Sequence, residues 1–131
     1  MERCCMNSTV RDWVAKAEAD FAMAAREMRA GRRRNNDGIY FHAQQAIEKL
    51  MKAAMIHDDQ TPPRTHDLVV LSKLLLAAHT LWRADAKALR FLTQGAVMLR
   101  YPGESATAGD ARKAMTYARA LRKALLDLLQ P

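Results

Sequence analysis

The sequence predicts an all-α protein, an up-and-down bundle of four long helices plus one shorter helix. Apolar residues recur at three- and four-residue spacing along most of the chain, and no segment alternates apolar and polar residues. Glycine and proline are scarce, and half of the 131 residues are hydrophobic, which suffices for one packed core. We therefore expect residues 9–131 to form a single helical domain behind a flexible N-terminus of residues 1–8.

The first helix is expected to begin near Ser8 or Thr9, because Thr9 and Asp12 have the spacing of a capping box. Gly31 is expected to stop this helix, since glycine tolerates the left-handed conformation that ends many helices. The apolar stripe of the helix consists of Trp13, Ala17, Phe21, Ala24 and Met28.

The second helix is expected to run from about Asp37 to Ile56, after a connection that begins at Arg32. Asn36 or Asp37 can cap its N-terminus. The consecutive prolines at positions 62 and 63 then favour an extended linker. The buried face of this helix is expected to contain Ile39, Ala43, Ala46, Ile47, Leu50 and Ala54.

Three further apolar patterns follow the linker. A third helix is expected to start near Thr65 or His66, and a fourth to run from about Ala84 to Leu99. Thr107 and Asp110 have capping-box spacing and open a last helix that continues to the C-terminus. The inward residues are expected to be Leu68, Leu71, Leu74, Leu75 and Ala78, then Leu89, Leu92, Ala96 and Leu99, then Met115, Ala118, Leu121, Leu125 and Leu128.

The charge balance favours an acidic partner. The formal net charge is +7, which suits RNA, nucleotides, an acidic protein or an anionic membrane. The densest basic run, residues 32–34, is interpreted as a solvated turn. Cys4 and Cys5 are adjacent and are the two cysteines of the chain, so no disulfide framework is expected, which fits a cytoplasmic location. No run of 18 apolar residues predicts a transmembrane helix.

Known chemical motifs are missing from the sequence. It contains no Glu-x-x-His pair of a di-iron bundle, no spaced Cys or His pairs for zinc, and no glycine-rich phosphate loop. We therefore predict no cofactor and no metal. Met51, Met55, Met98 and Met115 are expected to fill gaps in the core or in a dimer interface.

One polar line along the second helix is more ordered than a solvated face requires. His42, Gln45, Lys49 and Lys52 step by three, four and three residues, which places them along one side of the helix. Glu48 lies four residues before Lys52, the spacing of a favourable surface pair.

Two short polar elements at predicted helix ends add to this line. His66 and Asp67 stand where the third helix begins, and Arg100 and Tyr101 where the fourth ends. Asp67 can equally serve as a first-turn carboxylate that satisfies free amides. Basic, imidazole and phenol groups at helix ends can hold a phosphate or a base.

These motifs resemble the HEPN domain family. The run FHAQQAIEKLMKA, residues 41–53, is similar to the signature of the family's second helix. The runs THDL, residues 65–68, and RYP, residues 100–102, resemble two later elements in the same order. The resemblance covers residues 10–129 and implies a HEPN-like bundle of four or five helices.

The resemblance also implies function. Small HEPN proteins of bacterial or archaeal cytoplasm are commonly homodimers and often accompany a minimal nucleotidyltransferase in toxin–antitoxin-like pairs. Nucleotide binding is one activity implied by the family. Another is metal-independent RNA cleavage by an Arg, four to six residues and a His, contributed across the dimer.

This sequence departs from the ribonuclease signature, because no arginine precedes a histidine at that spacing. Our first hypothesis is therefore a non-catalytic HEPN protein that binds nucleotide or RNA, a nucleotidyltransferase partner, or both. The alternative is a ribonuclease in which His66 or His42 acts with Arg100, and a second alternative is a purely structural dimeric module. The candidate ligand-binding residues are His42, Gln45, Lys49, His66, Asp67, Arg100 and Tyr101.

Overall fold

Five α-helices make up most of residues 7–130, the part of the chain that the computed structural model describes. They are α1 (Ser8–Met28), α2 (Asn36–His57), α3 (Leu68–Leu75), α4 (Ala86–Met98) and α5 (Ala108–Leu128), and a 3-10 turn (Gly31–Arg33) follows α1. This range contains no β-strand, which confirms the predicted all-α bundle. Residues 1–6 of the expected flexible N-terminus, including Cys4 and Cys5, lie outside the described residues.

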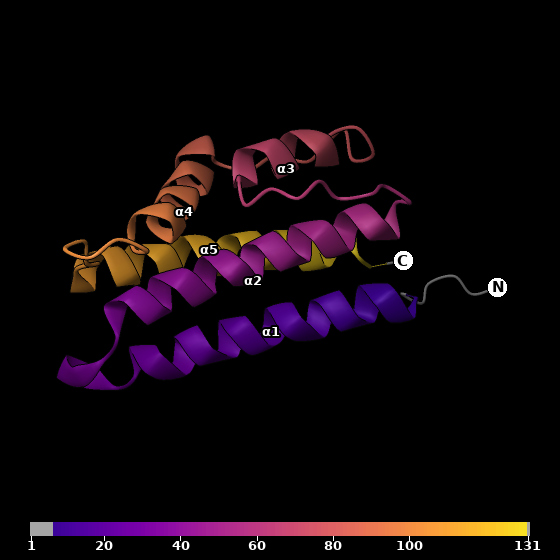
Figure 1. Ribbon diagram of the computed structural model, residues 1–131. Helices are drawn as coiled ribbons and strands as arrows, with labels where there is room; N and C mark the ends of the chain where they lie inside the picture. The colour runs from indigo at the N-terminus through magenta and orange to yellow at the C-terminus, as the bar shows by residue number, and fades with distance from the viewer. Residues whose placement is uncertain (1–6, 131) are drawn as a thin grey trace.

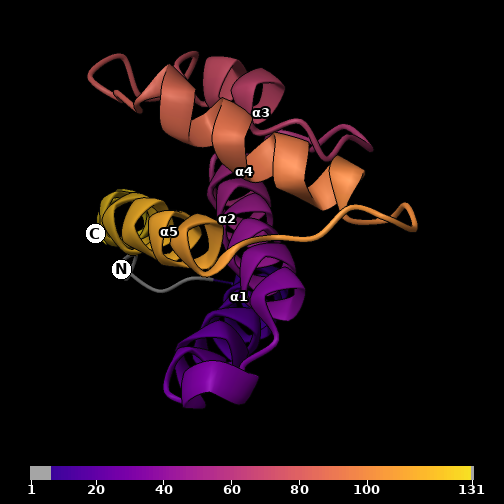
Figure 2. The ribbon, with the colours of Figure 1, turned by 90° about the vertical axis from the view of Figure 1, so that its left-hand side faces the viewer.

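The helices are arranged around α2, which packs against each of the other four. Figure 1 shows α1 and α2 side by side in opposite directions, with α5 behind α2. In Figure 2, α3 and α4 lie together on one side of α2, and α1 lies on the other. The central position of α2 explains why its apolar residues are buried on nearly all sides, from Ile39 to Met55.

Short polar side chains define where the helices begin. Asn7 caps α1 by accepting a hydrogen bond from the backbone N–H of Val10, and Asn35 does the same for Gly38 in α2. The expected cap at Thr9 and the expected cap at residue 36 or 37 are therefore wrong by one or two positions. Asp85 caps α4, which begins two residues later than expected.

The last helix starts as predicted, and the third does not. Thr107 and Asp110 form a complete capping box on α5. In contrast, α3 begins at Leu68, not at residue 65 or 66, because Asp67 caps it and holds an extended backbone before it. Leu74 of α3 is 37% exposed, so its predicted inward position is wrong.

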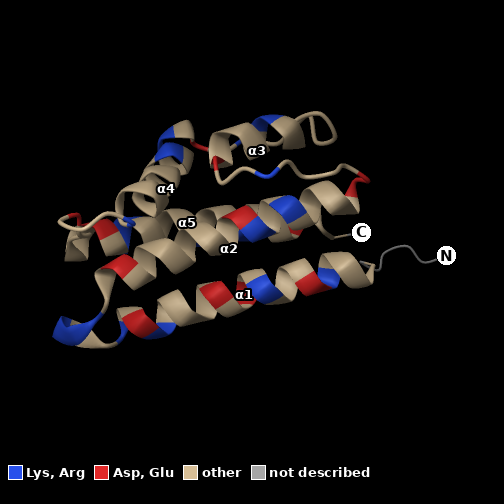
Figure 3. Ribbon diagram, in the orientation of Figure 1, with Lys and Arg blue, Asp and Glu red and all other residues tan. Residues whose placement is uncertain are grey.

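The basic turn between α1 and α2 is partly structural. Figure 3 shows this turn, with its arginines in blue, at the end of the bundle. Arg34 donates from Nε to the side chain of Asn36 at 3.0 Å and from Nη2 to the carbonyl of Ala108 at 3.0 Å. The third arginine of the run therefore ties this turn to the start of α5, while the other two are exposed.

An aromatic contact fixes α4 against α2. The ring of Tyr40 stacks on Phe91 with 4.9 Å between ring centroids, and its hydroxyl donates a hydrogen bond to the Phe91 carbonyl. Gly95 lies directly beneath the Tyr40 ring, where a Cβ atom would overlap with the ring carbons. The missing side chain of Gly95 thus permits the close approach of the two helices.

Within the described part of the chain, every helix is too short or too polar to cross a lipid bilayer.

Candidate functional site

Two buried carboxylates form hydrogen bonds and ion pairs with the polar side chains of α2. One is Asp20 of α1, which is 8% exposed, and the other is Glu48 of α2, which is 4% exposed. Each accepts contacts from two basic side chains. The polar line predicted from the sequence is therefore an internal network along two sides of α2.

The Asp20 carboxylate joins α1 to α2. Nδ1 of His42 lies 2.7 Å from its Oδ1, and Nζ of Lys49 lies 2.5 Å from its Oδ2. The side chains of His42 and Lys49 are 26% and 24% exposed, so both reach the surface beside this buried acid. Two of the predicted ligand-binding residues thus converge on one carboxylate.

The Glu48 carboxylate joins α2 to the connection that precedes α3. It accepts hydrogen bonds from Nζ of Lys52 and from Nε2 of Gln44, both at 3.0 Å, and Nδ1 of His66 lies 2.9 Å from its Oε1. The Glu48–Lys52 pair is buried, so its predicted place on the surface is wrong. The connection between α2 and α3 covers it.

The pKa of Glu48 reflects this setting. Burial by itself raises the pKa of a carboxyl group, but the hydrogen bonds from Gln44, His66 and Lys52 outweigh it. The net effect lowers the pKa of Glu48 below its ordinary value. The acid is therefore ionised at neutral pH although it is almost completely buried.

Gln45 is attached to the same network. Its Nε2 donates to Oε1 of Gln44 at 2.9 Å, and Nε2 of Gln44 in turn lies 3.3 Å from the carbonyl of His66. Gln44 is fully buried and was not singled out from the sequence. Its position four residues before Glu48 was the signal that could have identified it.

Asp67 is a helix cap. Its Oδ1 accepts a hydrogen bond from the backbone N–H of Val69 at 2.9 Å, and its own N–H donates to Oγ1 of Thr65. The structural interpretation of this residue is confirmed.

Arg100 and Tyr101 lie in a turn after α4, and the following segment returns to α2, where Ala106 N–H donates to Asp37. Tyr101 is 63% exposed. Within residues 7–130, neither side chain contacts His42, His66 or the two carboxylates through a hydrogen bond or ion pair. The structure therefore does not assemble the seven predicted residues in one cleft of a single chain.

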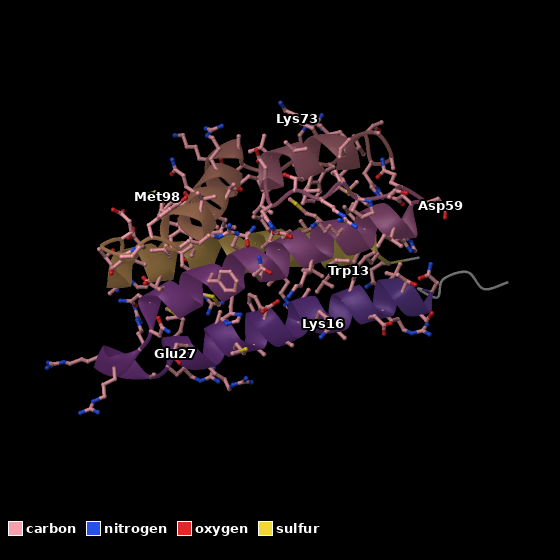
Figure 4. All side chains as sticks on the ribbon, viewed as in Figure 1. Trp13, Lys16, Glu27, Asp59, Lys73 and Met98 are labelled. Atoms are coloured by element: carbon pink, nitrogen blue, oxygen red, sulfur yellow. The ribbon has the colours of Figure 1, made fainter. Side chains whose placement is uncertain are left out.

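A hollow at the surface of α1 and α2 was missed by sequence reasoning. It has a volume of about 400 Å³ and is lined by Asp12, Trp13, Lys16 and Lys49. Figure 4 places Trp13 between α1 and α2 and Lys16 farther along α1. Trp13 was predicted in the apolar stripe, yet it is half-buried and borders this hollow. The three-residue step from Trp13 to Lys16 was a signal, but only the fold adds Lys49.

These features define the protein as a small helical bundle with an ionic network along its second helix. The sequence matches the HEPN domain over residues 10–128, so the chain belongs to the HEPN domain family. The match confirms the predicted family. Among curated proteins, no relative matches this sequence.

The fold is similar to a known crystal structure, that of the protein TT1696 from Thermus thermophilus. The TM-score is 0.71, the sequences are 18% identical, and the alignment covers 93% of this chain and 99% of that chain. This similarity supports the fold.

Proposed function

We propose that this HEPN protein is a non-catalytic binding module for the phosphates and bases of a nucleotide or RNA. The proposed site is the hollow lined by Trp13, Lys16 and Lys49, next to the Asp20 network. This hollow carries the proposal, because it brings an indole ring and two lysine amino groups to one surface. Aromatic rings stack on bases, and lysines neutralise phosphate.

The charges around the hollow support this proposal. Lys16 is exposed, and its amino group makes no hydrogen bond or ion pair within residues 7–130. Lys49 shares the Asp20 carboxylate with His42, so two basic side chains surround one acid. Among the described residues, Asp12 is the one acid that lines the hollow. The net charge of +7 adds a general attraction for polyanions.

The non-catalytic part of the proposal rests on the missing ribonuclease signature. Cleavage of RNA without a metal needs a proton-transfer group beside the 2′-hydroxyl and a cation beside the phosphorane. No arginine of this sequence stands four to six residues before a histidine, which is the arrangement that would supply this pair across the dimer.

The wider setting of the proposal comes from the family. We place the protein in the cytoplasm of a prokaryote as a homodimer and as the companion of a minimal nucleotidyltransferase in a toxin–antitoxin-like pair. Co-purification of the tagged chain from its native lysate, read by mass spectrometry, tests the partner. Recovery of the chain alone would remove the nucleotidyltransferase from the account.

Binding is tested with a fluorescein-labelled single-stranded RNA and fluorescence anisotropy, with ATP as a competitor. Lys16→Ala should weaken binding and lower the salt slope by about 0.7, the value for one phosphate contact on a single strand.

Trp13→Leu should cost about 1–3 kcal/mol of binding free energy, the range for one lost stacking contact. Asp12→Asn should strengthen binding, since it removes the acid that repels phosphate.

Lys123→Ala is the matched control, because Lys123 is 81% exposed on α5 and pairs with Asp127 across one helical turn. Its affinity should equal that of the parent. Equal losses in Lys16→Ala and Lys123→Ala would show that RNA is attracted by net charge alone, and the proposed site would be rejected.

A ribonuclease is the second candidate, and one observation favours it. Nδ1 of His66 is held by Glu48 while 59% of the histidine side chain remains exposed. A carboxylate that orients an accessible imidazole is the arrangement of a general base. This candidate predicts RNA cleavage that resists chelators and disappears in His66→Ala. Cleavage at the parental rate in that variant would exclude His66 from the mechanism.

A further inference from the structure

Exposed apolar side chains gather on one half of the molecule. Of the nine large hydrophobic residues that are exposed in residues 7–130, seven lie between positions 70 and 101. Val97 and Met98 of α4 are 48% and 47% exposed, and Val70 of α3 is 41% exposed. Such clustering marks an interaction surface more often than a solvated face.

A groove runs between the start of α3 and α4 within this region. It has a volume of about 520 Å³, and Val69, Val97 and Met98 form its apolar lining. Asp67, Arg90 and Thr93 also border it. We call this surface the α3–α4 groove.

The carboxylate of Asp67 and the hydroxyl of Thr93 are already satisfied. Asp67 accepts the Val69 N–H as the cap of α3. Oγ1 of Thr93 accepts the N–H of Leu68 at 3.1 Å and donates to the carbonyl of Leu89 at 2.8 Å. The groove therefore offers apolar side chains, the cation of Arg90 and the amide of Gln94.

The segments that form the groove carry more basic than acidic side chains, and Arg90 is the cation in its lining. Residues 67–98 contain four lysines or arginines, Lys73, Arg83, Lys87 and Arg90, against two acids, Asp67 and Asp85. The carboxylate of Asp85 is used to cap α4 by accepting the Lys87 N–H. Figure 3 shows the basic segments on α3 and α4, and Figure 4 shows Lys73 and Met98 on the outer sides of these helices.

We propose that the α3–α4 groove binds an acidic amphipathic helix of a partner protein. The apolar lining would accept the hydrophobic stripe of such a helix, as helix-in-groove complexes do. Arg90, with Lys73 and Lys87 on the same two helices, would pair with glutamates or aspartates beside the stripe. A second copy of this chain is a poorer occupant, because both faces of a symmetric contact would carry the same excess of basic side chains. The proposal does not depend on the Trp13 hollow, which lies on α1 and α2.

The test uses the full chain and a fluorescein-labelled synthetic peptide of 18 residues as the probe. The peptide carries leucines at helical three- and four-residue spacing and glutamates elsewhere, and a scrambled peptide of equal composition is its control. Met98→Asp and Arg90→Glu should each weaken binding of the patterned peptide by about thirty-fold, the size of a hot-spot loss. RNA binding by both variants should stay at the parental level, apart from a small uniform charge effect.

Two matched variants complete the design. Met23 of α1 is 47% exposed, the same as Met98, and Arg119 of α5 is exposed like Arg90. Met23→Asp and Arg119→Glu should retain the parental affinity for the peptide. Equal affinity for the scrambled peptide, equal losses in the control variants, or no binding of the patterned peptide would overturn the proposal. The proposal would also be overturned if RNA or anionic vesicles bound in place of the peptide and their binding were weakened by Met98→Asp and Arg90→Glu.

Discussion

Nδ1 of His66 lies 2.9 Å from Oε1 of Glu48, so a histidine before α3 contacts a carboxylate buried in the middle of α2. The carbonyl of His66 is also 3.3 Å from Nε2 of Gln44. These contacts fasten the connection between α2 and α3 along α2, and this connection in turn covers the Glu48–Lys52 pair. A motif that resembles a ligand site therefore also has a structural role.

The buried acid is expected to be important for stability. Glu48→Ala leaves Lys52 as a buried cation without its carboxylate, which should lower the free energy of unfolding by about 3 kcal/mol. Urea denaturation followed by circular dichroism measures this loss. The double variant Glu48→Met with Lys52→Met removes both charges and should be more stable than Glu48→Ala. A double variant that is less stable would contradict this account of the pair.

The loss of folding stability at acidic pH should depend on Glu48. Its pKa is lower in the folded chain than in the unfolded chain, so the unfolded state binds the proton more tightly. The resulting stability is present above the ordinary glutamate pKa and is lost as the pH falls toward the lowered value. The variant Glu48→Gln should be less stable than the parent at neutral pH and should lose less stability on acidification. If the free energy of unfolding of the two proteins changed with pH in parallel, Glu48 would be excluded as the cause of the acid sensitivity.

The contact of Tyr40 with Gly95 predicts a local steric effect. A Cβ atom at position 95 would lie 2.0 Å from a ring carbon of Tyr40, so the ring or α4 must move. Gly95→Ala should therefore lower the free energy of unfolding by about 1–3 kcal/mol, as overpacking does. Gly109→Ala in α5 is the control, because its nearest neighbours would be 3.7 Å away, and it should not destabilise. Thermal unfolding compares the two variants.

The signature residues predict a graded effect on RNA binding. Lys49→Ala with Arg100→Ala should weaken binding and lower its salt slope, because two cations are removed. The hollow contains Lys49 and not Arg100, so the single variant Lys49→Ala should account for most of the loss. Melting temperatures of both variants control for the lost Asp20–Lys49 contact. Unchanged affinity and slope in the double variant would place the ligand elsewhere.

Much of the fold could be predicted because helix periodicity is a local property. The predicted inward residues of α2 are all buried, although burial extends around that helix beyond its stripe, and the Thr107–Asp110 capping box was identified from spacing alone. The start of α3 was misplaced because Thr65 and Asp67 both satisfy helix-start rules, and Thr65 instead holds the Asp67 N–H. Several short polar residues in succession leave the choice of cap to tertiary contacts.

The candidate site was less predictable because it depends on which element covers each side of α2. Spacing placed His42 and Lys49 on one face, but only the fold brings Asp20 of α1 to both. The same spacing suggested a surface position for Glu48, which the connection before α3 covers. Trp13 fitted an apolar stripe, and its second role beside Lys49 required the packing of α1 on α2.

The central claim is the binding site at Trp13, and the chain contains two tryptophans that allow a direct test. Trp82 is 5% exposed, and its indole N–H donates to Oγ of Ser72 at 2.8 Å, whereas Trp13 borders the open hollow. The measurement is a nitrogen-15 NMR titration of the full chain with a short single-stranded RNA. The account predicts that the indole signal of Trp13 shifts, with backbone amides of residues 12–20 and 45–52, while that of Trp82 stays in place. A stationary Trp13 signal, with shifts confined to α3 and α4 or absent, would contradict it.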